Sequence, residues 1–287
     1  MKIQDILNTG INKLKNKSTS PALDAEVLLA YALNKPKEHL YIHANHELRL
    51  RKRVRNYLGL IEKRAQGWPV AYLTGQKEFY GLKFFVDKNV LTPRPETECL
   101  VELVLQKLKI VNCKLRILDV GTGSGCIIIS LTKALSTLAP HPSTLFSASD
   151  ISKAALKVAQ KNANLHKVKI AFKHGSLLKP WEGKNFDIIV ANLPYLAKQT
   201  DPSTKFEPRR ALIAKKQGLA LIENLIRQIR SYSLIRPFAD SIFLEFDPRQ
   251  AKQIKKLAKK YLPKFETKIF KDLAGKQRFA CLSLKLS

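Results

Sequence analysis

The sequence predicts an α/β fold in which a doubly wound, mostly parallel sheet follows a small domain of helices. Three observations lead to this prediction. From Leu91 onward, short β-branched runs alternate with stretches of helical periodicity, which is the pattern of a parallel sheet covered on both faces. Residues 1–67 lack such runs and look helical. A glycine-rich turn, Gly121-Thr-Gly-Ser-Gly125, joins one predicted strand to the helix after it.

The composition suits one large or two unequal domains in a reducing compartment. Of the 287 residues, 45% are hydrophobic, which is enough for a core. No apolar run approaches the roughly 20 residues that span a bilayer, and the N-terminus is amphipathic, so we expect neither a membrane segment nor a secretory signal. Cys99, Cys113, Cys126 and Cys281 show no C-x-x-C spacing, which argues against zinc and against a disulfide framework. We therefore expect a cytoplasmic protein without a metal.

The chain is strongly basic. Lysine and arginine number 51 against 23 aspartates and glutamates, so the formal net charge is +28. A field of this strength attracts anionic partners and speeds their encounter with the protein. Nucleic acid, the ribosome and an acidic protein surface are all compatible with it. Solubility alone would also account for such a surface, so the charge selects no partner by itself.

A helical domain is predicted for residues 1–75. Ser20 and Pro21 stand where the cap and the first position of a helix belong. The residues that follow at helical spacing are Leu23, Val27, Leu28 and Tyr31. A further helix is predicted from 47 to 65, and its expected buried stripe is Leu48, Val54, Leu58 and Ile61.

The helix at 47–65 also carries the densest basic cluster that we find in the sequence. The cluster consists of Arg49, Arg51, Lys52, Arg53, Arg55, Lys63 and Arg64. A solvated helix face is the ordinary interpretation of such a cluster. Contact of helix 49–64 with RNA phosphates or with an acidic protein surface is the alternative.

The remaining elements are predicted in the order that a doubly wound sheet requires. Residues 76–90 form a β-hairpin linker around Gly81, and residues 91–287 form the sheet domain. Helices are predicted at 96–108, 126–135, 151–165, 218–235 and 249–261. Parallel strands are predicted at 115–120, 145–149, 169–172, 186–191 and 241–246, and an antiparallel hairpin at 265–270 and 278–284.

The glycine-rich turn predicts a binding site for a methyl donor. Glycines let the backbone approach a ligand closely, and the helix beyond them offers free N–H groups and a positive dipole end. The dinucleotide fingerprint is G-x-G-x-x-G, whereas this turn is one residue shorter and has Asp119 two positions before it. These features favour S-adenosylmethionine over a dinucleotide. The residues predicted to bind it are Asp119, Gly121, Thr122, Gly123, Ser124 and Gly125.

Two more residues are predicted to hold this donor. Asp150 ends the next strand, where a carboxylate can accept from both ribose hydroxyls. A helix cap is the alternative role for Asp150, but Ser152 is better placed to be the cap. Ser176 follows the third strand, where methyltransferases often place an aspartate that accepts from the adenine amino group. A hydroxyl can still form a hydrogen bond there.

The apolar run at 188–191 ends in Asn192-Leu193-Pro194-Tyr195. In open α/β sheets, ligands bind beyond the carboxyl ends of the strands. An amide, a rigid turn and a phenol at that place can hold a planar substrate that bears a nitrogen. A proline turn closed by the asparagine is the alternative interpretation. Since the tetrapeptide follows the glycine-rich turn and Asp150 in the expected order, we interpret it as the substrate site, with Asn192 close to the donor as well.

With these motifs in place, the chain resembles the release-factor glutamine N5-methyltransferases almost from end to end. The matching segments are Leu23-Asp-Ala-Glu-Val-Leu-Leu29, Pro69-Val-Ala-Tyr-Leu-Thr-Gly75, Phe79-Tyr-Gly81, Leu91-Thr-Pro-Arg-Pro-Glu-Thr-Glu98, Phe206-Glu-Pro-Arg-Arg-Ala-Leu212 and Asp272-Leu-Ala-Gly-Lys-Gln-Arg278. The segment at 91–98 is the most specific of them. The family usually has N-P-P-Y at its active site, so Leu193 is a departure. Leucine at that place also occurs in rRNA adenine dimethyltransferases.

The resemblance implies a class I methyltransferase sheet and an S-adenosylmethionine-dependent enzyme of translation termination. Its substrate would be the glutamine of the Gly-Gly-Gln loop of a peptide-chain release factor, gripped by the N-terminal helices. Asn192 Oδ1 and the carbonyl of Leu193 would accept both amide hydrogens, Pro194 would stiffen the loop, and Tyr195 would pack on the amide plane. Two alternatives stay open at this point. One is an N6-adenine methyltransferase that acts on rRNA or DNA, and the other is a non-catalytic ribosome- or RNA-binding protein on a methyltransferase scaffold.

Overall fold

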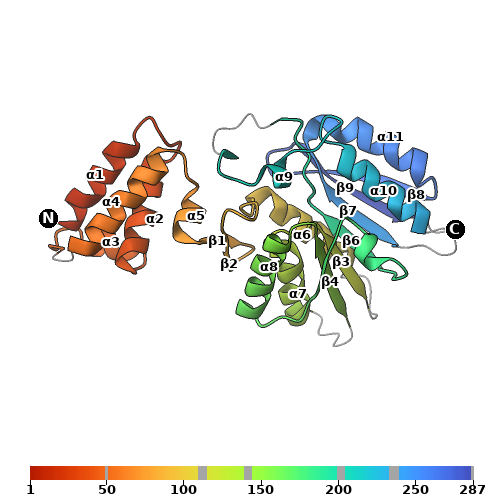
Figure 1. Ribbon diagram of the computed structural model, residues 1–287, viewed down its shortest axis with the longest axis horizontal. Coiled ribbons are helices and arrows are strands. Elements are labelled where there is room, and N and C mark those ends of the chain that lie inside the picture. The colour runs from red at the N-terminus through yellow and green to blue at the C-terminus, as the bar shows by residue number, and fades with distance from the viewer. Residues whose placement is uncertain (49–50, 109–114, 139–143, 199–203, 233–238, 286–287) are drawn as a thin grey trace. The chain divides into compact units, whose positions relative to one another are not determined.

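The computed structural model describes residues 1–48, 51–108, 115–138, 144–198, 204–232 and 239–285. Two compact units make up the chain (Figure 1). The smaller unit comprises Met1–Gln76 with Thr200–Phe206, and the larger unit comprises Lys77–Gln199 with Glu207–Ser287. Three parts of the sequence predictions lie outside the described residues: Arg49, Cys113 and the end of the predicted helix at 233–235.

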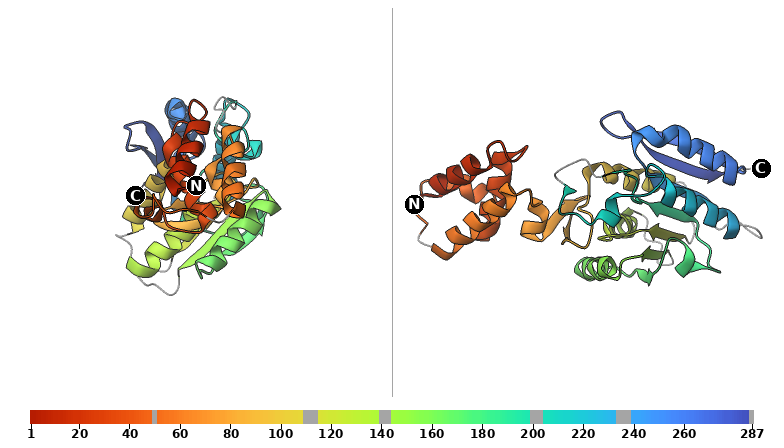
Figure 2. Two further views of the ribbon diagram at one scale, coloured as in Figure 1. Left: turned by 90° about the vertical axis from the view of Figure 1, so that its left-hand side faces the viewer. Right: turned by 45° about the horizontal axis from the view of Figure 1, so that its top comes forward.

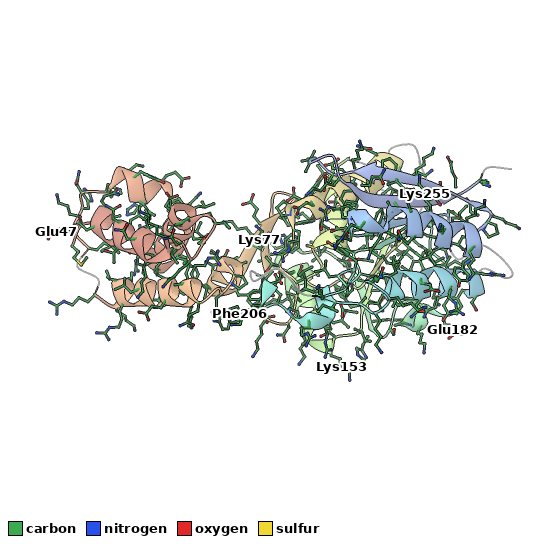
Figure 3. All side chains as sticks on the ribbon, turned by 90° about the horizontal axis from the view of Figure 1, so that it is seen from above. Glu47, Lys77, Lys153, Glu182, Phe206 and Lys255 are labelled. Atoms are coloured by element: carbon green, nitrogen blue, oxygen red, sulfur yellow. The ribbon has the colours of Figure 1, made fainter. Side chains whose placement is uncertain are left out.

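The smaller unit is a bundle of short helices (Figure 2). They are α1 (Ile3–Leu14), α2 (Pro21–Leu33), α3 (Glu38–Ile42), α4 (Arg51–Ala65) and α5 (Val70–Thr74). Leu14, Leu28, Leu29 and Ile61 are buried where α1, α2 and α4 meet. Trp68 stacks on Phe206 within the same unit, with ring centroids 4.5 Å apart, and Phe206 is labelled in Figure 3. The helical character predicted for this region is confirmed.

Several details of the smaller unit differ from the sequence predictions. Glu47 belongs to an isolated antiparallel bridge with Lys2, so it does not start the next helix, which spans Arg51–Ala65. The buried residues of α4 are Tyr57, Leu60 and Ile61, whereas Leu48, Val54 and Leu58 are only partly buried. On α2, Leu23 and Tyr31 are exposed, because the face that packs against the bundle is Ala25, Leu28, Leu29 and Ala32.

The residues at the start of α2 occupy the predicted positions, but the Ser20 side chain makes a different hydrogen bond from that of a helix cap. Pro21 occupies the first turn and Ser20 the cap position, as predicted. The Ser20 hydroxyl, however, donates to Asp24 Oδ1 at 3.2 Å and does not accept from the helix backbone. Asp24 is itself buried, and its Oδ2 accepts a hydrogen bond from Arg64 Nε at 2.6 Å. Arg64 therefore belongs to a buried ion pair and not to the predicted basic face of α4.

The larger unit begins with a hairpin and continues into a seven-stranded sheet. Strands β1 (Gln76–Phe79) and β2 (Leu82–Phe85) turn at Tyr80 and Gly81, which both have positive φ, as a tight hairpin turn requires. The sheet has the order β5-β4-β3-β6-β7-β9-β8. Its strands are β3 (Arg116–Val120), β4 (Leu145–Asp150), β5 (Ala171–His174), β6 (Ile188–Ala191), β7 (Ser241–Glu245), β8 (Phe265–Lys271) and β9 (Gln277–Leu284).

The pairing of these strands confirms the predicted fold class. Strands β3 to β7 pair in parallel with one another, and β9 pairs antiparallel with both β7 and β8. Helices α6 (Glu98–Leu108), α7 (Cys126–Leu138) and α8 (Lys153–Leu165) cover one face, and α10 (Ala220–Tyr232) and α11 (Ala251–Tyr261) cover the other (Figure 1). The result is a mostly parallel sheet of the class I methyltransferase type with an antiparallel C-terminal hairpin.

The burial of β6 explains why its sequence is an unbroken apolar run. Ile188 and Val190 pack into the core under α6 and α7, while Ile189 and Ala191 pack into the core under α10 and α11. All four residues are therefore buried, as expected for a central parallel strand with helices on both sides. The tetrapeptide Asn192–Tyr195 follows this strand directly, so it lies at the carboxyl end of the parallel strands.

The element boundaries differ from the predictions by a few residues. Strand β5 starts at Ala171, two residues later than predicted, and short 3₁₀ turns at Pro95–Thr97 and Pro248–Gln250 replace the first residues of two predicted helices. Proline at the first helical position explains both of those turns, because its fixed φ suits a tight opening turn. A further 3₁₀ turn spans Lys179–Trp181, and the short helix α9 (Arg209–Leu212) was not predicted.

Basic side chains are spread over the larger unit as well as over α4. Lys153 and Lys255, labelled in Figure 3, project from α8 and α11 and are exposed. The exposed lysines of α11 are Lys252, Lys255, Lys256, Lys259 and Lys260. Among the described helices, none is both long enough and apolar enough to cross a bilayer.

Candidate active site

A pocket opens at the carboxyl ends of β3, β4, β5 and β6. Its walls come from the segments 89–94, 121–124, 150–152, 175–177 and 192–194, with Thr97, Arg210 and Ala211 among the further contributors. All of these residues belong to the larger unit. The pocket therefore lies where ligands of open α/β sheets bind, and it brings together the glycine-rich turn, Asp150, Ser176 and most of the tetrapeptide.

The glycine-rich turn is held by hydrogen bonds to the neighbouring strand. The backbone N–H groups of Gly121 and Thr122 both donate to the carbonyl of Ser149, at 2.8 and 3.0 Å. Gly123 N–H donates to Asp150 Oδ2 at 2.9 Å. Gly121, Gly123 and Gly125 all have positive φ, which only glycine adopts without strain. These hydrogen bonds and backbone conformations fix the shape of the turn against β4.

Two of the predicted donor-binding residues lie behind the turn and not in the pocket wall. Asp119 is fully buried, and its Oδ2 accepts the Thr122 hydroxyl at 2.6 Å. Burial raises the pKa of Asp119 from 3.8 to about 7. A Cβ on Gly125 would lie 2.9 Å from Ile129 Cδ1, so Gly125 provides close packing against α7. These two residues shape the turn, whereas Gly121, Thr122, Gly123 and Ser124 line the pocket.

Asp150 faces the pocket with a carboxylate that is already anchored. Its Oδ2 accepts from Gly123 N–H, and its Oδ1 accepts from Ser152 N–H at 2.8 Å. Because a carboxylate has about four acceptor positions, both oxygens can accept further hydrogen bonds. Burial raises the pKa of Asp150, and the backbone N–H bonds from Ser152 and Gly123 oppose that rise. Ser152 is the cap of α8 and accepts from Ala155 N–H at 3.2 Å, as predicted.

Two further polar groups complete the pocket wall. Ser176 lines it beside Gly175 and Leu177. Thr92 also lines it, and its buried hydroxyl has no hydrogen-bond partner among the described residues. Together with the Asp150 carboxylate and apolar walls, these groups fit a nucleoside-bearing methyl donor such as S-adenosylmethionine.

Asn192 lines the pocket with its amide fixed from behind. Its Nδ2 donates to Thr97 Oγ1 at 3.1 Å and to Glu245 Oε2 at 3.0 Å. No hydrogen bond to its Oδ1 is found in the part of the chain that the structure describes. An amide held in this way offers an acceptor, and not a donor, to a ligand.

Leu193 and Pro194 line the pocket next to Asn192. The Leu193 side chain is buried in the core under α10, and its Cδ2 would lie 2.9 Å from a Cβ on Gly121. The leucine that departs from the usual family motif therefore packs closely against the glycine-rich turn. Because glycine stands at position 121, the two loops approach each other without a clash.

Tyr195 is held by hydrogen bonds through its side-chain hydroxyl and its backbone carbonyl, but it does not line the pocket. Its hydroxyl donates to Glu245 Oε1 at 3.1 Å, and its carbonyl accepts from Gln250 Nε2 at 2.9 Å. Burial raises the pKa of Tyr195 well above its ordinary value. A Cβ on Gly218, which has a φ of +87°, would lie only 1.8 Å from the Tyr195 carbonyl oxygen. The structure thus places Tyr195 as an anchored end of the tetrapeptide.

Sequence reasoning missed the residues that hold the tetrapeptide. Thr97 lies in the segment 91–98 that resembles the family, but the sequence assigns it no role, and it assigns none to Glu245 or Gln250. Glu245 offered a signal, because an acidic residue at the end of the apolar strand 241–245 is unusual for a buried position. Burial raises the pKa of Glu245, and the Arg278 guanidinium opposes that rise. Arg278 is itself paired with Asp272 at 2.8 Å.

The matching segments around 92–94 and 207 form a second buried contact beside the pocket. Glu207 accepts from Thr92 N–H at 3.3 Å and pairs with Arg94. Thr92 and Arg94 line the pocket, so Glu207 supports its wall from outside. Within the described residues, no group of three His, Cys, Asp or Glu side chains is arranged to hold a metal ion.

Comparison with known protein families gives two matches that cover most of the chain. Residues 5–75 match the family model described as the PrmC N-terminal domain. Residues 96–216 match the model described as the methyltransferase small domain.

Two curated proteins that share one name, release factor glutamine methyltransferase, are similar to this chain. The release factor glutamine methyltransferase of Coxiella burnetii is 38% identical over 223 residues, which covers 77% of this chain and 78% of that protein. The release factor glutamine methyltransferase of Salmonella typhimurium is 34% identical over 291 residues, which covers 98% of both chains.

Solved structures agree on the fold. The catalytic domain of hMettl16 in complex with an RNA hairpin gives a TM-score of 0.57 at 15% identity, over 90% of this chain and 93% of that one. The 16S rRNA N2 G1207 methyltransferase of Thermus thermophilus, solved with AdoMet and guanosine, gives a TM-score of 0.50 at 15% identity, over 73% of this chain and 50% of that one. At such low identity these likenesses concern the fold alone.

Proposed function

The chain belongs to the release factor glutamine methyltransferase family, and on that premise we propose that it methylates the side-chain nitrogen (N5) of a glutamine in a peptide-chain release factor. The methyl donor is S-adenosylmethionine, and the glutamine is that of the factor's Gly-Gly-Gln loop. One observation supports this proposal most directly. The Nδ2 of Asn192 is used by Thr97 and Glu245, so its Oδ1 is left to accept a hydrogen bond from a substrate amide.

The donor would be held by residues of the glycine-rich turn and of the next two strand ends. Bound there, S-adenosylmethionine supplies an electrophilic methyl group on a sulfonium. Asp150 would accept from the ribose hydroxyls, and Ser176 would contact the base. Gly121–Ser124 would pack against the donor through their backbone, which the missing side chains of Gly121 and Gly123 allow. Asp119 and Gly125 would act indirectly by fixing the shape of the turn.

The acceptor would be held by Asn192 and Leu193. Asn192 Oδ1 and the main-chain carbonyl of Leu193 would each accept one hydrogen of the glutamine –NH2 group. Two acceptors aimed at those hydrogens favour the positive charge that develops on the nitrogen during transfer. Alignment of the nitrogen with the methyl group can supply roughly 7–11 kcal/mol. The N–C bond would form as the S–C bond to the sulfonium breaks, with S-adenosylhomocysteine as the leaving group. The N–H becomes acidic only at that point, so its proton can pass to water and no strong base is needed.

Tyr195 would contribute by anchoring this loop. Its hydroxyl bond to Glu245 and its carbonyl bond to Gln250 hold the residue that follows Pro194. Pro194 itself stiffens the turn between Leu193 and Tyr195. This assignment revises our expectation that Tyr195 packs on the amide plane, since Tyr195 is not among the residues that line the pocket.

The helical domain would recognise the release factor. Arg51, Lys52, Arg55 and Lys63 of α4 are exposed, and an acidic surface on the factor is the partner that this basic face suits. Attraction of this kind weakens as salt rises, so the association rate measured at low and at physiological ionic strength tests it. An association rate that does not change with salt would exclude the steering role. Because its substrate works in translation, the enzyme would act in the cytoplasm.

One experiment separates this function from the two alternatives. The purified protein is incubated with S-adenosylmethionine that carries a labelled methyl group, together with a release factor and rRNA, and the methylated products are mapped by mass spectrometry. We expect one methyl group on the glutamine of the Gly-Gly-Gln loop, and none on a control factor with glutamate at that position. Label on rRNA adenine would establish the nucleic-acid alternative, and donor binding without any methylated product would favour the non-catalytic one.

A further inference from the structure

We propose that Glu245 is a positioning residue that decides which atom of Asn192 faces the substrate. This inference rests on the proposed function and concerns the same site. Glu245 ends β7, the strand next to β6, and its side chain is 1% exposed. Its carboxylate collects three hydrogen bonds: from Thr97 Oγ1 at 2.7 Å, from Asn192 Nδ2 at 3.0 Å and from the Tyr195 hydroxyl at 3.1 Å.

The problem that Glu245 solves is the near symmetry of an amide group. The oxygen and nitrogen of an asparagine side chain have similar sizes, so a half-turn about its last bond exchanges a hydrogen-bond acceptor for a donor. A substrate –NH2 group can bind to Asn192 Oδ1 but would meet only other N–H groups at Nδ2. The orientation of this one side chain therefore decides whether the substrate is held.

Glu245 sets the orientation of the Asn192 amide in two ways, directly and through Thr97. Glu245 Oε2 already accepts from the Thr97 hydroxyl, so it offers only lone pairs to Asn192; it attracts Nδ2 and would repel Oδ1 in the reversed orientation. The Thr97 hydroxyl donates its single hydrogen to Glu245 Oε2, which leaves only lone pairs to face Asn192. Thr97 thus also becomes an acceptor toward Nδ2. Both groups behind Asn192 then require that Oδ1 points into the pocket.

The burial of Glu245 argues that it serves more than stability. Taking a carboxylate out of water is costly, and well-packed apolar residues often replace buried charged groups without loss of stability. The positive charge of the Arg278 guanidinium lowers that cost. Replacing Glu245 alone would leave the donors of Thr97, Asn192 and Tyr195 without this acceptor and would cost stability in either case. A positioning role is therefore distinguished by a loss of kcat in a variant that remains folded.

The test uses the full chain with two substitutions at this position. Glu245→Met removes the acceptors but keeps the volume, and Glu245→Gln keeps one acceptor that can face Asn192. We expect kcat for a Gly-Gly-Gln peptide to fall by about 100-fold in E245M and by about 10-fold in E245Q, as for the loss of one group that orients a transition state. Affinity for S-adenosylhomocysteine, the donor's product, should stay within about threefold in both, because Glu245 does not line the pocket.

A matched control is available on the same unit. Glu223 is a partly buried carboxylate on α10 that pairs with Lys216 and has no contact with the pocket. E223M makes the same chemical change and should keep kcat within about twofold, as expected for a surface substitution. Thermal unfolding of all variants shows whether E245M is folded. If E245M unfolds, E245Q still decides the question, because wild-type kcat in folded E245Q would overturn the inference.

The second readout is the side-chain amide resonance of Asn192, which needs no methyl acceptor. In a ¹⁵N–¹H spectrum this signal is assigned by its loss in Asn192→Ala. We expect it to shift in E245M and to stay near its wild-type position in E223M. An unchanged Asn192 signal together with wild-type kcat in E245M would overturn the inference, and so would a parallel loss of product affinity. Failure of the proposed function would look different, since the wild-type protein would then methylate no release factor.

Discussion

The glycine-rich turn Gly121–Gly125 and the tetrapeptide Asn192–Tyr195 are two loops of one pocket that are held in different ways. They follow β3 and β6, which pair in parallel, and Leu193 packs close to Gly121. The side-chain partners of the turn lie near it in the sequence: Asp119 is 3 residues from Thr122, and Asp150 is 27 residues from Gly123. Asn192 is held instead by Thr97 and Glu245, at separations of 95 and 53 residues.

This difference suggests how the two jobs of the enzyme are divided. The glycine-rich turn, which we propose to hold the donor, has its side-chain partners Asp119 and Asp150 within the unit β3–α7–β4. The acceptor loop exists only after the segment before α6, the end of β7 and the loop after it have come together. We therefore expect changes at β7 and beyond to affect methyl transfer while leaving donor binding almost intact. Changes next to the glycine-rich turn should weaken donor affinity while leaving the affinity for a release-factor peptide almost unchanged.

The largest expected effect comes from Gly218→Ala. The added Cβ would lie 1.8 Å from the Tyr195 carbonyl oxygen and 2.6 Å from Gln250 Nε2, so the tetrapeptide has to move. We expect methyl transfer to fall by more than about 100-fold, because a displacement of about 1 Å already has that effect. Donor affinity by calorimetry should change much less.

Gly183→Ala is the matched control for this substitution. Gly183 also has a positive φ, of +73°, but a Cβ there would have no atom within 4 Å. It should destabilise the protein by about 1 kcal/mol through backbone strain alone and leave transfer unchanged. Equal losses of transfer in the two variants would show that strain, and not the contact with Tyr195, is responsible.

An intermediate effect is expected from Asp150→Asn, on the donor side. The amide has only one acceptor oxygen for the N–H groups of Gly123 and Ser152, and its –NH2 group would face one of those donors. We expect donor affinity by calorimetry to weaken by about 10- to 100-fold, since hydrogen bonds to charged groups contribute about 1.5–3 kcal/mol. Affinity for a release-factor peptide should hardly change. A loss confined to peptide binding would contradict the division between the two loops.

The smallest effect on catalysis is expected from Asp119→Asn, which instead alters stability. The pKa of Asp119 is raised from 3.8 to about 7, so the folded protein binds this proton more tightly than the unfolded chain does. Its favourable contribution is therefore complete below pH ~4 and is lost as pH rises through about 7, which corresponds to at most ~4 kcal/mol. The neutral variant should be more stable than wild type by about 1–3 kcal/mol at pH 8 in urea unfolding, and the difference should vanish near pH 4. If the variant were less stable than wild type at pH 8, burial of the ionised Asp119 carboxylate would not destabilise the folded protein, and this prediction would be wrong.

Sequence reasoning succeeded where partners are close along the chain. The strand-turn-helix at 115–135 contains its own glycines, its aspartate and its helix start, so the shape of the donor turn follows from a short segment. The unbroken apolar run of β6 likewise indicated a strand buried on both faces. The acidic end of the strand at 241–245 made Glu245 unusual, but the same reasoning could not find the partners of Glu245 or Gln250. Their role depends on β7 lying next to β6, and no local pattern encodes that pairing.

The helical domain shows a similar limit. Periodicity located α2 and α4, but it did not reveal which face of each helix is buried, since that depends on how the helices pack on one another. Arg64 illustrates the consequence. In the sequence it is one of seven basic residues, and in the structure it forms a buried pair with Asp24, a residue 40 positions away.

The central claim is that the two loops divide the work, with donor binding on one and presentation of the acceptor on the other. The most direct test is Asn192→Ala, assayed for donor affinity by calorimetry and for methyl transfer to a release factor with labelled donor. We predict that transfer falls by about 10²- to 10³-fold, as for the loss of one group that stabilises developing charge, while donor affinity stays within about threefold. Undiminished transfer, or a loss of donor affinity as large as the loss of transfer, would contradict the claim.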